Sequence, residues 1–458
     1  MTPLPAGIRL VLDRSVRRPR RGQVLSGGMP PRLLRLTPAG SAALEELLAG
    51  GAGSEPARRL GRRLVDAGLA HPQPRRAGPA PEATVVVPVR DRTAELGRCL
   101  AALDRPGAVI VVDDGSRDPA AIAAVCRRHG ATLLRHERSL GPAAARNAGL
   151  EAATTELVAF VDSDCLPEPG WTGRLAGHFA DPLVAAVAPR VRPLARRRRA
   201  GVLARFMATR CPLDMGEDPG GVAPGRRVPY VPTAALLARR AALAPFDADL
   251  RHGEDVDFVW RLHDAGWRVV YDPEVVAHHI EPARWRSVLA RRWRYGTSAA
   301  ALARRHPTRL PPLVLQPGPT AAAALLLARR PSLAAGVAAL VAAWLARRTR
   351  PAGLPATQAI AWSTQAVHHA VLSAGRAGTI FAAPVLLAAL GWRRTRPAAL
   401  VLLIGPPLEE WYRRRPSLDP ARWTLACAAD DVAYGLGVWR GCLAVGTARP
   451  LLPQRSIW

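Results

Sequence analysis

Between Thr84 and Val161, short runs of β-branched and apolar residues alternate with alanine-rich stretches, and this alternation restricts the fold more than any other feature of the chain. Strands that alternate with helical stretches are typical of a sheet whose strands run parallel and whose helices cross its faces. Four strands are predicted, over residues 84–89, 108–112, 131–135 and 156–161. We therefore expect an α/β domain, which we place at residues 82–305.

Two carboxylates follow the fourth predicted strand. Asp162 and Asp164 stand there with one residue between them, and ligands of open α/β sheets bind outside the carboxyl ends of strands. Carboxylates this close repel each other unless a cation lies beside them. Mg²⁺ and Mn²⁺ commonly join such carboxylates to a diphosphate, so we expect one of these cations here. A turn or a helix cap is the alternative explanation of an isolated Asp-x-Asp.

A second acidic group follows the second predicted strand, where Asp113 and Asp114 precede a Gly-Ser turn. A carboxylate at this place accepts hydrogen bonds from a base or a ribose, and glycine lets the backbone approach a ligand. Alone, the segment is equally typical of a β-turn that leads into a helix cap. The segment supports a ligand site because acidic residues follow the ends of two predicted strands, the second and the fourth.

The chain contains one asparagine, Asn147, and it follows Arg146. In a composition that almost excludes asparagine, we expect this side chain to have a specific hydrogen-bonding role. Arg146 is suited to a bidentate contact with a phosphate or a base carbonyl. The alternative is a solvated helix face.

A fourth group begins an amphipathic helix at Glu254, Asp255 and Asp257. Acidic residues in a first helical turn are often only partners of the helix dipole. The alternative is that one of them is a general base, which takes a proton from an acceptor hydroxyl group.

In this order, the four groups resemble the family 2 glycosyltransferases of the GT-A fold. The resemblance implies a Rossmann-like mixed sheet and an inverting hexosyltransferase that uses a nucleotide-sugar donor. It also implies Asp255, in the Glu254–Asp255 pair, as the base, and Asp164 as a metal ligand. The histidines His278 and His279 are candidates for a further metal or diphosphate contact, with a plain strand end as the alternative. The implied contacts to the nucleotide come from Pro88, Arg90, Asp113, Asp114, Arg146 and Asp162, the last of which also approaches the metal.

Residues 1–75 are expected to form a separate small domain. Alternating apolar residues from Ile8 to Leu12 predict a strand, and helices are predicted over 39–48 and 57–67 with Thr37 as a cap. The proline-rich segment 71–83 is expected to be an extended linker. This part resembles the peptide-recognition domains of the PqqD family, which implies a winged-helix-like α+β domain and a peptide-derived acceptor.

Residues 306–458 are rich in Ala, Leu, Arg and Pro, with apolar blocks at 331–346, 377–392 and 397–408. None of the blocks reaches the roughly 20 residues of a membrane-spanning helix. Residues 306–458 therefore have two interpretations: a helical region that packs on the catalytic domain, or a region that associates shallowly with a membrane.

The amino-terminal part, the transferase part and the tail segment from Asp430 to Leu443 together are similar to the glycosyltransferases of mycofactocin biosynthesis. That similarity implies transfer of glucose from UDP-glucose to a peptide-derived redox cofactor or its precursor, with a β-linked oligosaccharide as product. Processive members of family 2 carry Gln or Arg where this chain has Leu289, which argues against long processive synthesis. Two alternatives remain: a membrane enzyme acting on a polyprenyl phosphate or cell-wall glycan, and a catalytically inert peptide-binding scaffold.

The formal charge of +28 does not by itself indicate a nucleic-acid partner. All 64 basic residues are arginine, which indicates a codon bias, and aromatic residues are not interleaved with the arginine runs as in single-strand binders. The six cysteines are scattered singly, which favours a reducing compartment. The first residues lack the apolar core of a secretory signal. We therefore expect a cytoplasmic protein or one at the inner face of the cell membrane.

Overall fold

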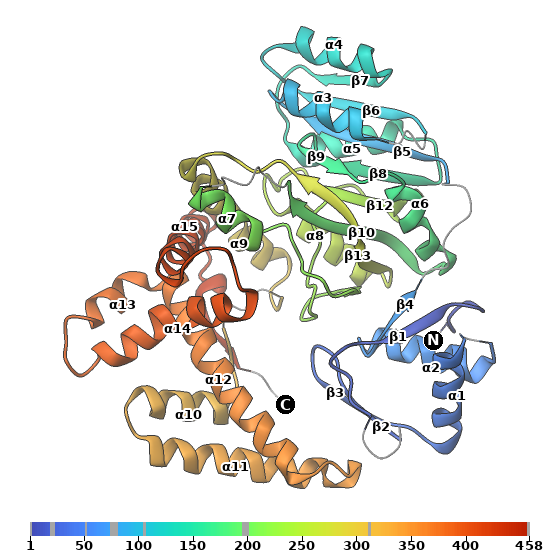
Figure 1. Cartoon of the computed structure of the whole chain (residues 1–458). Helices are drawn as coiled ribbons and strands as arrows, with labels where there is room; N and C mark the ends of the chain where they lie inside the picture. The colour runs from blue at the N-terminus through green and yellow to red at the C-terminus, as the bar shows by residue number, and fades with distance from the viewer. Residues whose placement is uncertain are drawn as a thin grey trace. The chain divides into compact units, whose positions relative to one another are not determined.

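The computed structural model describes residues 2–18, 23–50, 53–73, 81–103, 107–194, 201–309 and 313–455. The chain divides into two compact units. The sheet unit comprises Met1–Ala195 with Arg210–Glu281, and the helical unit comprises Arg196–Thr209 with Pro282–Trp458. Figure 1 shows the strands gathered in the first and the long helices in the second.

A nine-stranded mixed sheet forms the centre of the sheet unit, within the residues that the structure describes. Its main path is β11-β13-β10-β12-β8-β5-β6-β7, and β9 pairs with β13 beside this path. The strands β8, β5, β6 and β7 run parallel, whereas β12 is antiparallel to both of its neighbours. The bounds are Ala83–Val89 (β5), Val109–Asp114 (β6), Thr132–His136 (β7), Leu157–Val161 (β8), Cys165–Pro167 (β9), Val184–Pro193 (β10), Gly220–Val222 (β11), Ala235–Arg239 (β12) and Arg268–His279 (β13).

The four predicted strands are confirmed as β5 to β8, and the GT-A-like mixed sheet is confirmed as well. The strands β10, β12 and β13 were not among those predicted from the sequence. The reason is physical for β10 and β12, because both are buried on both faces along most of their length. A strand of this kind is a continuous apolar run, which has no period-two pattern to distinguish it from a helix.

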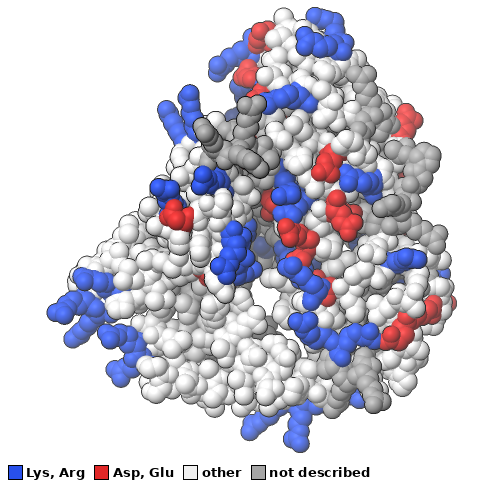
Figure 2. Space-filling model, viewed as in Figure 1, with Lys and Arg blue, Asp and Glu red and all other residues white. Residues whose placement is uncertain are grey.

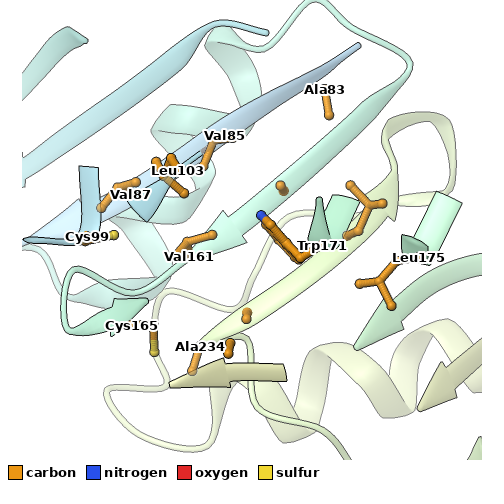
Figure 3. Packing of buried hydrophobic residues seen from close by; sticks show 14 of the residues in the cluster. Ala83, Val85, Val87, Cys99, Leu103, Val161, Cys165, Trp171, Leu175 and Ala234 are labelled. Atoms are coloured by element: carbon orange, nitrogen blue, oxygen red, sulfur yellow. The ribbon is translucent and has the colours of Figure 1, made fainter. Parts of the chain in front are cut away.

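Helices α3, α4, α5, α6 and α8 pack on the sheet, and side chains of α3, α4 and α6 form an apolar core together with its strands. Figure 3 shows Val85, Val87, Val161 and Trp171 in the core between strands and helices. Helix α5 lies very close to β5. Gly149 permits this approach, since a Cβ atom at its position would overlap the side chain of Val86. The helices of this part are Thr93–Ala102 (α3), Pro119–His129 (α4), Pro142–Ala152 (α5), Trp171–Ala176 (α6) and Glu254–Asp264 (α8).

The amino-terminal part of the sheet unit, here called the N-terminal module, is an α+β fold with its own apolar core. Its core includes Leu25, Leu44, Leu47 and Leu64. The predicted cap is confirmed, since the Thr37 hydroxyl accepts a hydrogen bond from the Gly40 amide at 3.1 Å. The elements are Arg9–Leu12 (β1), Val24–Gly27 (β2), Arg32–Arg35 (β3), Pro38–Ala49 (α1), Glu55–Asp66 (α2) and Ala70–Gln73 (β4).

The predicted linker over residues 71–83 was wrong at both of its ends. His71, Pro72 and Gln73 belong to β4, which pairs antiparallel with β1, and Ala83 begins β5. Pro72 fits because a strand in a two-stranded pair has one edge without a ladder, where no amide hydrogen is needed. The part of the predicted linker at 74–80 lies outside the described residues.

Two bidentate ion pairs, one of them buried, join the N-terminal module to the rest of the sheet unit. Arg62 of α2, with no exposed surface, donates to both carboxylate oxygens of Asp181 at 2.7 and 2.8 Å. Arg268 at the start of β13 makes the same bidentate contact with Asp66, at 2.9 Å for each bond. A bidentate pair fixes orientation as well as distance. The two pairs therefore hold α2 of the module against the segments at Asp181 and Arg268.

The helical unit is built from long, alanine-rich helices. Among the described residues, no single helix has the length and apolar character to cross a membrane, although α12 and α13 pass that test jointly with a bend of 109° between them. The elements are Val202–Thr209 (α7), Trp285–Arg305 (α9), Val314–Leu315 (β14), Pro317–Leu327 (α10), Pro331–Thr349 (α11), Ala356–Phe381 (α12), Ala383–Ala389 (α13), Arg396–Arg414 (α14), Pro420–Val445 (α15) and Gln454–Arg455 (β15).

Glycines explain the close crossing of α9 and α15. A Cβ atom at Gly437 would overlap the backbone carbonyl oxygen of Trp293, and Gly441 stands in the same relation to Thr297. Only glycine allows two helix backbones to approach in this way. The tail segment picked out from the sequence at 430–443 therefore has a packing role inside the helical unit.

We expect Gly437→Ala to destabilise the protein by roughly 1–3 kcal/mol, because the added methyl group forces the two helices apart. Gly336, in the middle of α11, has open space where its Cβ would lie, so it serves as the matched control. Gly336→Ala should stabilise by about 0.5–1 kcal/mol through helix propensity. Urea unfolding of the two variants measures both shifts, and equal effects would contradict the packing role of Gly437.

Candidate active site

Arg146 of α5 joins two acidic groups that lie about ninety residues apart in the sequence. One of its terminal amino groups donates to Asp162 Oδ1 at 2.7 Å, and the other donates to Glu254 Oε1 at 2.8 Å. The residue is 4% exposed. The contact links the end of β8 to the start of α8, and so the Asp-x-Asp segment and the Glu254–Asp255 pair belong to one site.

Burial favours loss of the proton from Arg146, but the negative charges of Asp162 and Glu254 outweigh this effect and raise the pKa of the guanidinium. The arginine therefore stays charged inside the protein. Its position differs from the phosphate contact expected from the sequence, because both terminal amino groups point at protein carboxylates. Contact of Arg146 with a nucleotide remains a prediction.

Asn147 fixes the neighbouring chain segment through two hydrogen bonds. Its side-chain amide donates to the carbonyl oxygen of Phe246 at 2.9 Å and accepts from the Phe246 amide at 2.7 Å. The ring of Phe246 lies 5.7 Å from the Arg146 guanidinium. The expectation that the only asparagine has a specific hydrogen-bonding role is confirmed.

Asp164 is held between two cationic side chains, His279 and Arg92. Asp164 Oδ2 lies 3.4 Å from His279 Nε2 and also pairs with Arg92. The backbone carbonyl of Asp164 accepts from Ile280 at 2.9 Å, which brings the end of β13 to the Asp-x-Asp segment. Burial would raise the pKa of Asp164, but the hydrogen bond and charge of His279, together with the charge of Arg92, lower it.

His279 has a second carboxylate on its other nitrogen, which was not among the residues predicted from the sequence. His279 Nδ1 lies 2.9 Å from Glu281 Oε1. Burial opposes the charged imidazole, but Asp164 and Glu281 outweigh this and raise the pKa of His279 to about 9. Glu281 stands two residues after a strand-end histidine, and that proximity is the feature from which it could have been found.

The donors at this place fit a divalent cation only if a ligand supplies part of the coordination shell. Among the residues that the structure describes, no group of three or more His, Cys, Asp and Glu side chains is suited to hold a metal ion. Asp164 offers one donor and His279 a second, through Nε2 once the imidazole has lost its proton, while Asp162 uses one oxygen for Arg146. A hard cation that takes its other ligands from a diphosphate matches this set. His278 is not part of it, because its Nε2 lies 3.6 Å from Glu168 instead.

Asp255 differs in its surroundings from Glu254 and Asp257, the other acidic residues of the first turn of α8. Burial raises the pKa of this carboxyl group to about 7, and the charge of Glu254 acts in the same direction, against Arg146. Its hydrogen bond within the described part of the chain comes from the Val256 amide at 2.8 Å. Glu254 is engaged by Arg146, and Asp257 forms an ion pair with Arg261 at 2.7 Å. Asp255 is therefore the carboxylate of this turn that is left to accept a proton.

Asp114 organises the loop that follows β7. Burial opposes its charge, but hydrogen bonds from His136, Ser139 and two backbone amides outweigh burial and lower the pKa of Asp114. The two amides belong to Leu140 and Gly141, at 2.8 and 2.9 Å. Its carboxylate thereby holds the chain segment that leads into α5, the helix of Arg146.

Asp113 lies entirely inside the protein, with 0% exposure. It accepts from the Ser116 amide at 2.9 Å and pairs with Arg135. In this geometry it positions the turn after β6 and offers no surface to a ligand. The nucleotide contact expected for it therefore stays a prediction that requires Arg135 to move.

The other two nucleotide-binding candidates lie at the end of β5. Pro88 is half-buried beside Val112 of β6, and Arg90 has a side chain that is 56% exposed. Arg90 donates to the Ser139 hydroxyl at 3.0 Å, which is the hydroxyl that also donates to Asp114. The candidates from the ends of β5 and β6 are thus connected through one serine.

A cavity of about 1400 Å³ lies elsewhere in the sheet unit. Its lining includes Val11 of β1, His71 of β4 and the segment 266–275 at the beginning of β13. His279 lies at the opposite end of β13. The large cavity is therefore separate from the acidic site.

Models of known families match the chain over both units. Residues 84–222 match "Glycosyl transferase family 2", and residues 157–402 match "Glycosyl transferase family group 2". The pre-mycofactocin glycosyltransferase of Mycobacterium tuberculosis is 38% identical over 473 residues, which cover 99% of this chain and 99% of the relative. The glycosyltransferase AglE of Haloferax volcanii is 26% identical, over 47% of this chain and 72% of the relative.

Among solved structures, the mannosyltransferase PcManGT from Pyrobaculum calidifontis, in complex with GDP-Man and Mn²⁺, superposes with a TM-score of 0.45. It is 20% identical and covers 80% of this chain and 91% of that one. The assignment to a family does not rest on this structural similarity. It rests on one family model that matches more than half of the chain and on one relative that matches nearly all of it. From its sheet, its acidic site and these matches, the chain belongs to the family 2 glycosyltransferases.

Proposed function

We propose that the chain is an inverting hexosyltransferase that moves glucose from UDP-glucose to a peptide-derived redox cofactor or its precursor, as in mycofactocin biosynthesis. The observation that carries this proposal is the double contact of Arg146, which brings the Asp-x-Asp segment and the Glu254–Asp255 pair into one site. The acceptor follows from the name of the M. tuberculosis relative and the presence of the N-terminal module. Transfer from UDP-sugars to a synthetic peptide-derived acceptor tests the proposal as a whole.

In this mechanism, Asp255 takes the proton of the acceptor hydroxyl group as its oxygen bonds to the anomeric carbon. The bond between that carbon and the diphosphate breaks on the opposite face, and the nucleoside diphosphate leaves with the electron pair. Glu254 does not compete for the proton, because it is paired with Arg146. Arg146 thereby also limits the repulsion between Glu254 and the ionised base.

Asp164 and His279, with Asp162 nearby, would hold Mg²⁺ or Mn²⁺. Such a cation neutralises charge on the leaving diphosphate. Glu281 orients the His279 ring, as carboxylates commonly do for metal-binding histidines. Arg92 pairs with Asp164 in the described geometry, so it competes with a cation for the same oxygen.

In the proposal, the nucleotide lies along the ends of β5, β6 and β8, with Pro88, Arg90 and Asp162 facing it. Asp113 and Asp114 hold the surrounding turns, through Ser116 and through the loop at 139–141. These contacts support the proposal, because they fix the shape of the two loops that follow β6 and β7.

In the N-terminal module, the peptide would add to the edge of β3. Within the described residues β3 pairs only with β2, and its Arg32, Leu33 and Arg35 are exposed. An unpaired edge with an exposed apolar side chain suits an extended peptide, which gains main-chain hydrogen bonds there. A polyprenyl phosphate or cell-wall glycan is the alternative acceptor. Neither has a peptide main chain that could form hydrogen bonds with the edge of a strand.

The pH profile of transfer tests the role of Asp255. A base must be deprotonated to act, and its pKa is about 7. We therefore expect kcat/KM to fall about tenfold per pH unit below roughly pH 7 and to level off above it. Asp255→Asn should reduce transfer by roughly 10²–10⁴-fold while UDP binding persists. Asp257→Asn, in the same helical turn, should keep the acidic limb of the profile, and loss of that limb in this control would remove Asp255 from the base role.

Binding of Mn²⁺ in the presence of UDP, followed by electron paramagnetic resonance, tests the proposed metal site. Asp164→Asn should abolish the bound signal. Glu281→Gln should weaken Mn²⁺ binding by roughly 10–100-fold, because the imidazole loses its orienting partner. Arg92→Ala should tighten binding, since it removes the competing cation. Weaker binding in the Arg92 variant would contradict the competition.

The edge-strand proposal is tested by Leu33→Glu in the full chain. We expect a rise of at least about tenfold in KM for the peptide-derived acceptor, because a charge is placed against the apolar peptide face. UDP-glucose hydrolysis in water should not change. Val11→Glu is the matched control, since Val11 is 44% exposed and Leu33 is 42% exposed in the same module. A larger effect at Val11 would move the peptide to the cavity beside β1.

A further inference from the structure

The end of helix α13 and the turn after it expose apolar side chains that a water-facing hairpin would normally avoid. Val385 is 67% exposed, Leu387 is 59% exposed and Trp392 is 65% exposed. None of the residues of α13 is buried. We call Val385, Leu387 and Trp392 the apolar tip. Exposed groups of this kind commonly mark a surface that binds a partner or a membrane.

The turn that carries the apolar tip is well ordered by hydrogen bonds. The Thr395 hydroxyl donates to the Ala389 carbonyl at 2.7 Å, and Arg396 Nε donates to the Leu390 carbonyl at 2.8 Å. Ala389 is the last residue of α13 and Leu390 is its C-cap, so both carbonyls lie at the helix end, where they lack partners within the helix. The exposure of the tip is therefore built into the fold.

The segment that carries the apolar tip is rich in arginine, and the nearest acidic residues along the chain after it are Glu409 and Glu410 of α14. From Pro282 to Leu408 the sequence contains 17 arginines and neither aspartate nor glutamate. Two of these arginines, Arg393 and Arg394, are exposed and directly follow Trp392. In the part of the chain that the structure describes, no ion pair joins either of them to an acidic residue. Such a surface attracts anions and repels cationic partners.

Further apolar side chains are exposed along the same segment of the helical unit. Leu400, Val401 and Ile404 of α14 follow the turn, and Leu340 of α11 is 72% exposed. In Figure 2, blue side chains stand at the left and lower margins of the helical unit, with a broad white surface between them. Apolar area bordered by arginine is the pattern of a protein that lies in the interface of an anionic bilayer.

We propose that the helical unit docks on an anionic lipid bilayer, with the apolar tip inserted into one leaflet and Arg393 and Arg394 on lipid phosphates. A seven-residue helix such as α13 is about 10 Å long, which is far too short to cross a bilayer. The bend of 109° between α12 and α13 turns the chain back, as insertion from one side requires. Tryptophan next to arginine suits the level of the headgroups.

This docking is independent of the acceptor and of the sugar transfer proposed above. It concerns residues that have no part in the acidic site, so vesicle binding is measured without any substrate. Failure of transfer would leave it standing, and failure of docking would leave the transferase mechanism standing.

The test is cosedimentation of the full chain with vesicles of phosphatidylcholine, with and without phosphatidylglycerol. We expect binding to the anionic vesicles, with little binding to neutral ones, and weakening at high salt. The variant Val385→Ser/Leu387→Ser/Trp392→Ser should lose binding by roughly tenfold or more. Arg393→Ser and Arg394→Ser should each weaken it about fivefold, as expected for one basic residue at an anionic surface.

Matched controls lie in the N-terminal module. Met29→Ser/Leu33→Ser removes apolar side chains that are 53% and 42% exposed, and Arg59→Ser removes an arginine whose side chain is 66% exposed. Both should bind vesicles like the unmodified chain. Unchanged melting temperature and unchanged UDP-glucose hydrolysis in the tip variant show that it is folded.

Insertion itself is measured with a fluorescent NBD label on Val385→Cys, because the six native cysteines are buried. A blue shift on anionic vesicles, absent for the same label on Leu33→Cys, supports the proposal. Absence of vesicle binding, or equal loss of binding in the controls, overturns it. A tip variant that binds vesicles normally but changes from dimer to monomer also overturns it, because a second copy of the chain would then cover the tip.

Discussion

Arg146 is almost fully removed from water, and a guanidinium in that position needs anions within hydrogen-bonding distance. Asp162 and Glu254 supply them from two segments about ninety residues apart. The position of the arginine depends in turn on α5, which approaches β5 closely because residue 149 is glycine. The geometry of the acidic site thus follows from one helix-to-strand approach and one buried charge.

The two halves of the site have opposite electrostatic surroundings. Asp164 is flanked by His279 and Arg92, which lower its pKa, whereas burial raises the pKa of Asp255 to about 7. A carboxylate kept ionised suits the binding of a cation, and a carboxylate that titrates near neutral pH suits proton transfer. The division of tasks between them follows from their neighbours, because the two side chains are chemically the same.

The sequence predicted the four parallel strands and the acidic groups at 113–114, 162–164 and 254–257, because strand ends and Asp-rich turns are local features. It did not predict β10 and β12, whose burial on both faces removes the alternating pattern. Nor did it predict that Arg146 points at carboxylates, or that Glu281 supports His279, since both depend on contacts between distant segments. The boundaries placed at residues 75 and 305 stay predictions.

The buried pair between Arg62 and Asp181 has a consequence for how the enzyme can be dissected. Removing the N-terminal module takes away the Arg62 partner of the Asp181 carboxylate, and the isolated module keeps Arg62 without that carboxylate. A chimera that combines this N-terminal module with the transferase part of a relative should therefore be stable only if both Arg62 and a carboxylate at the position of Asp181 are present. The stability of the N-terminal module and that of the sheet behind it are therefore linked through one ion pair.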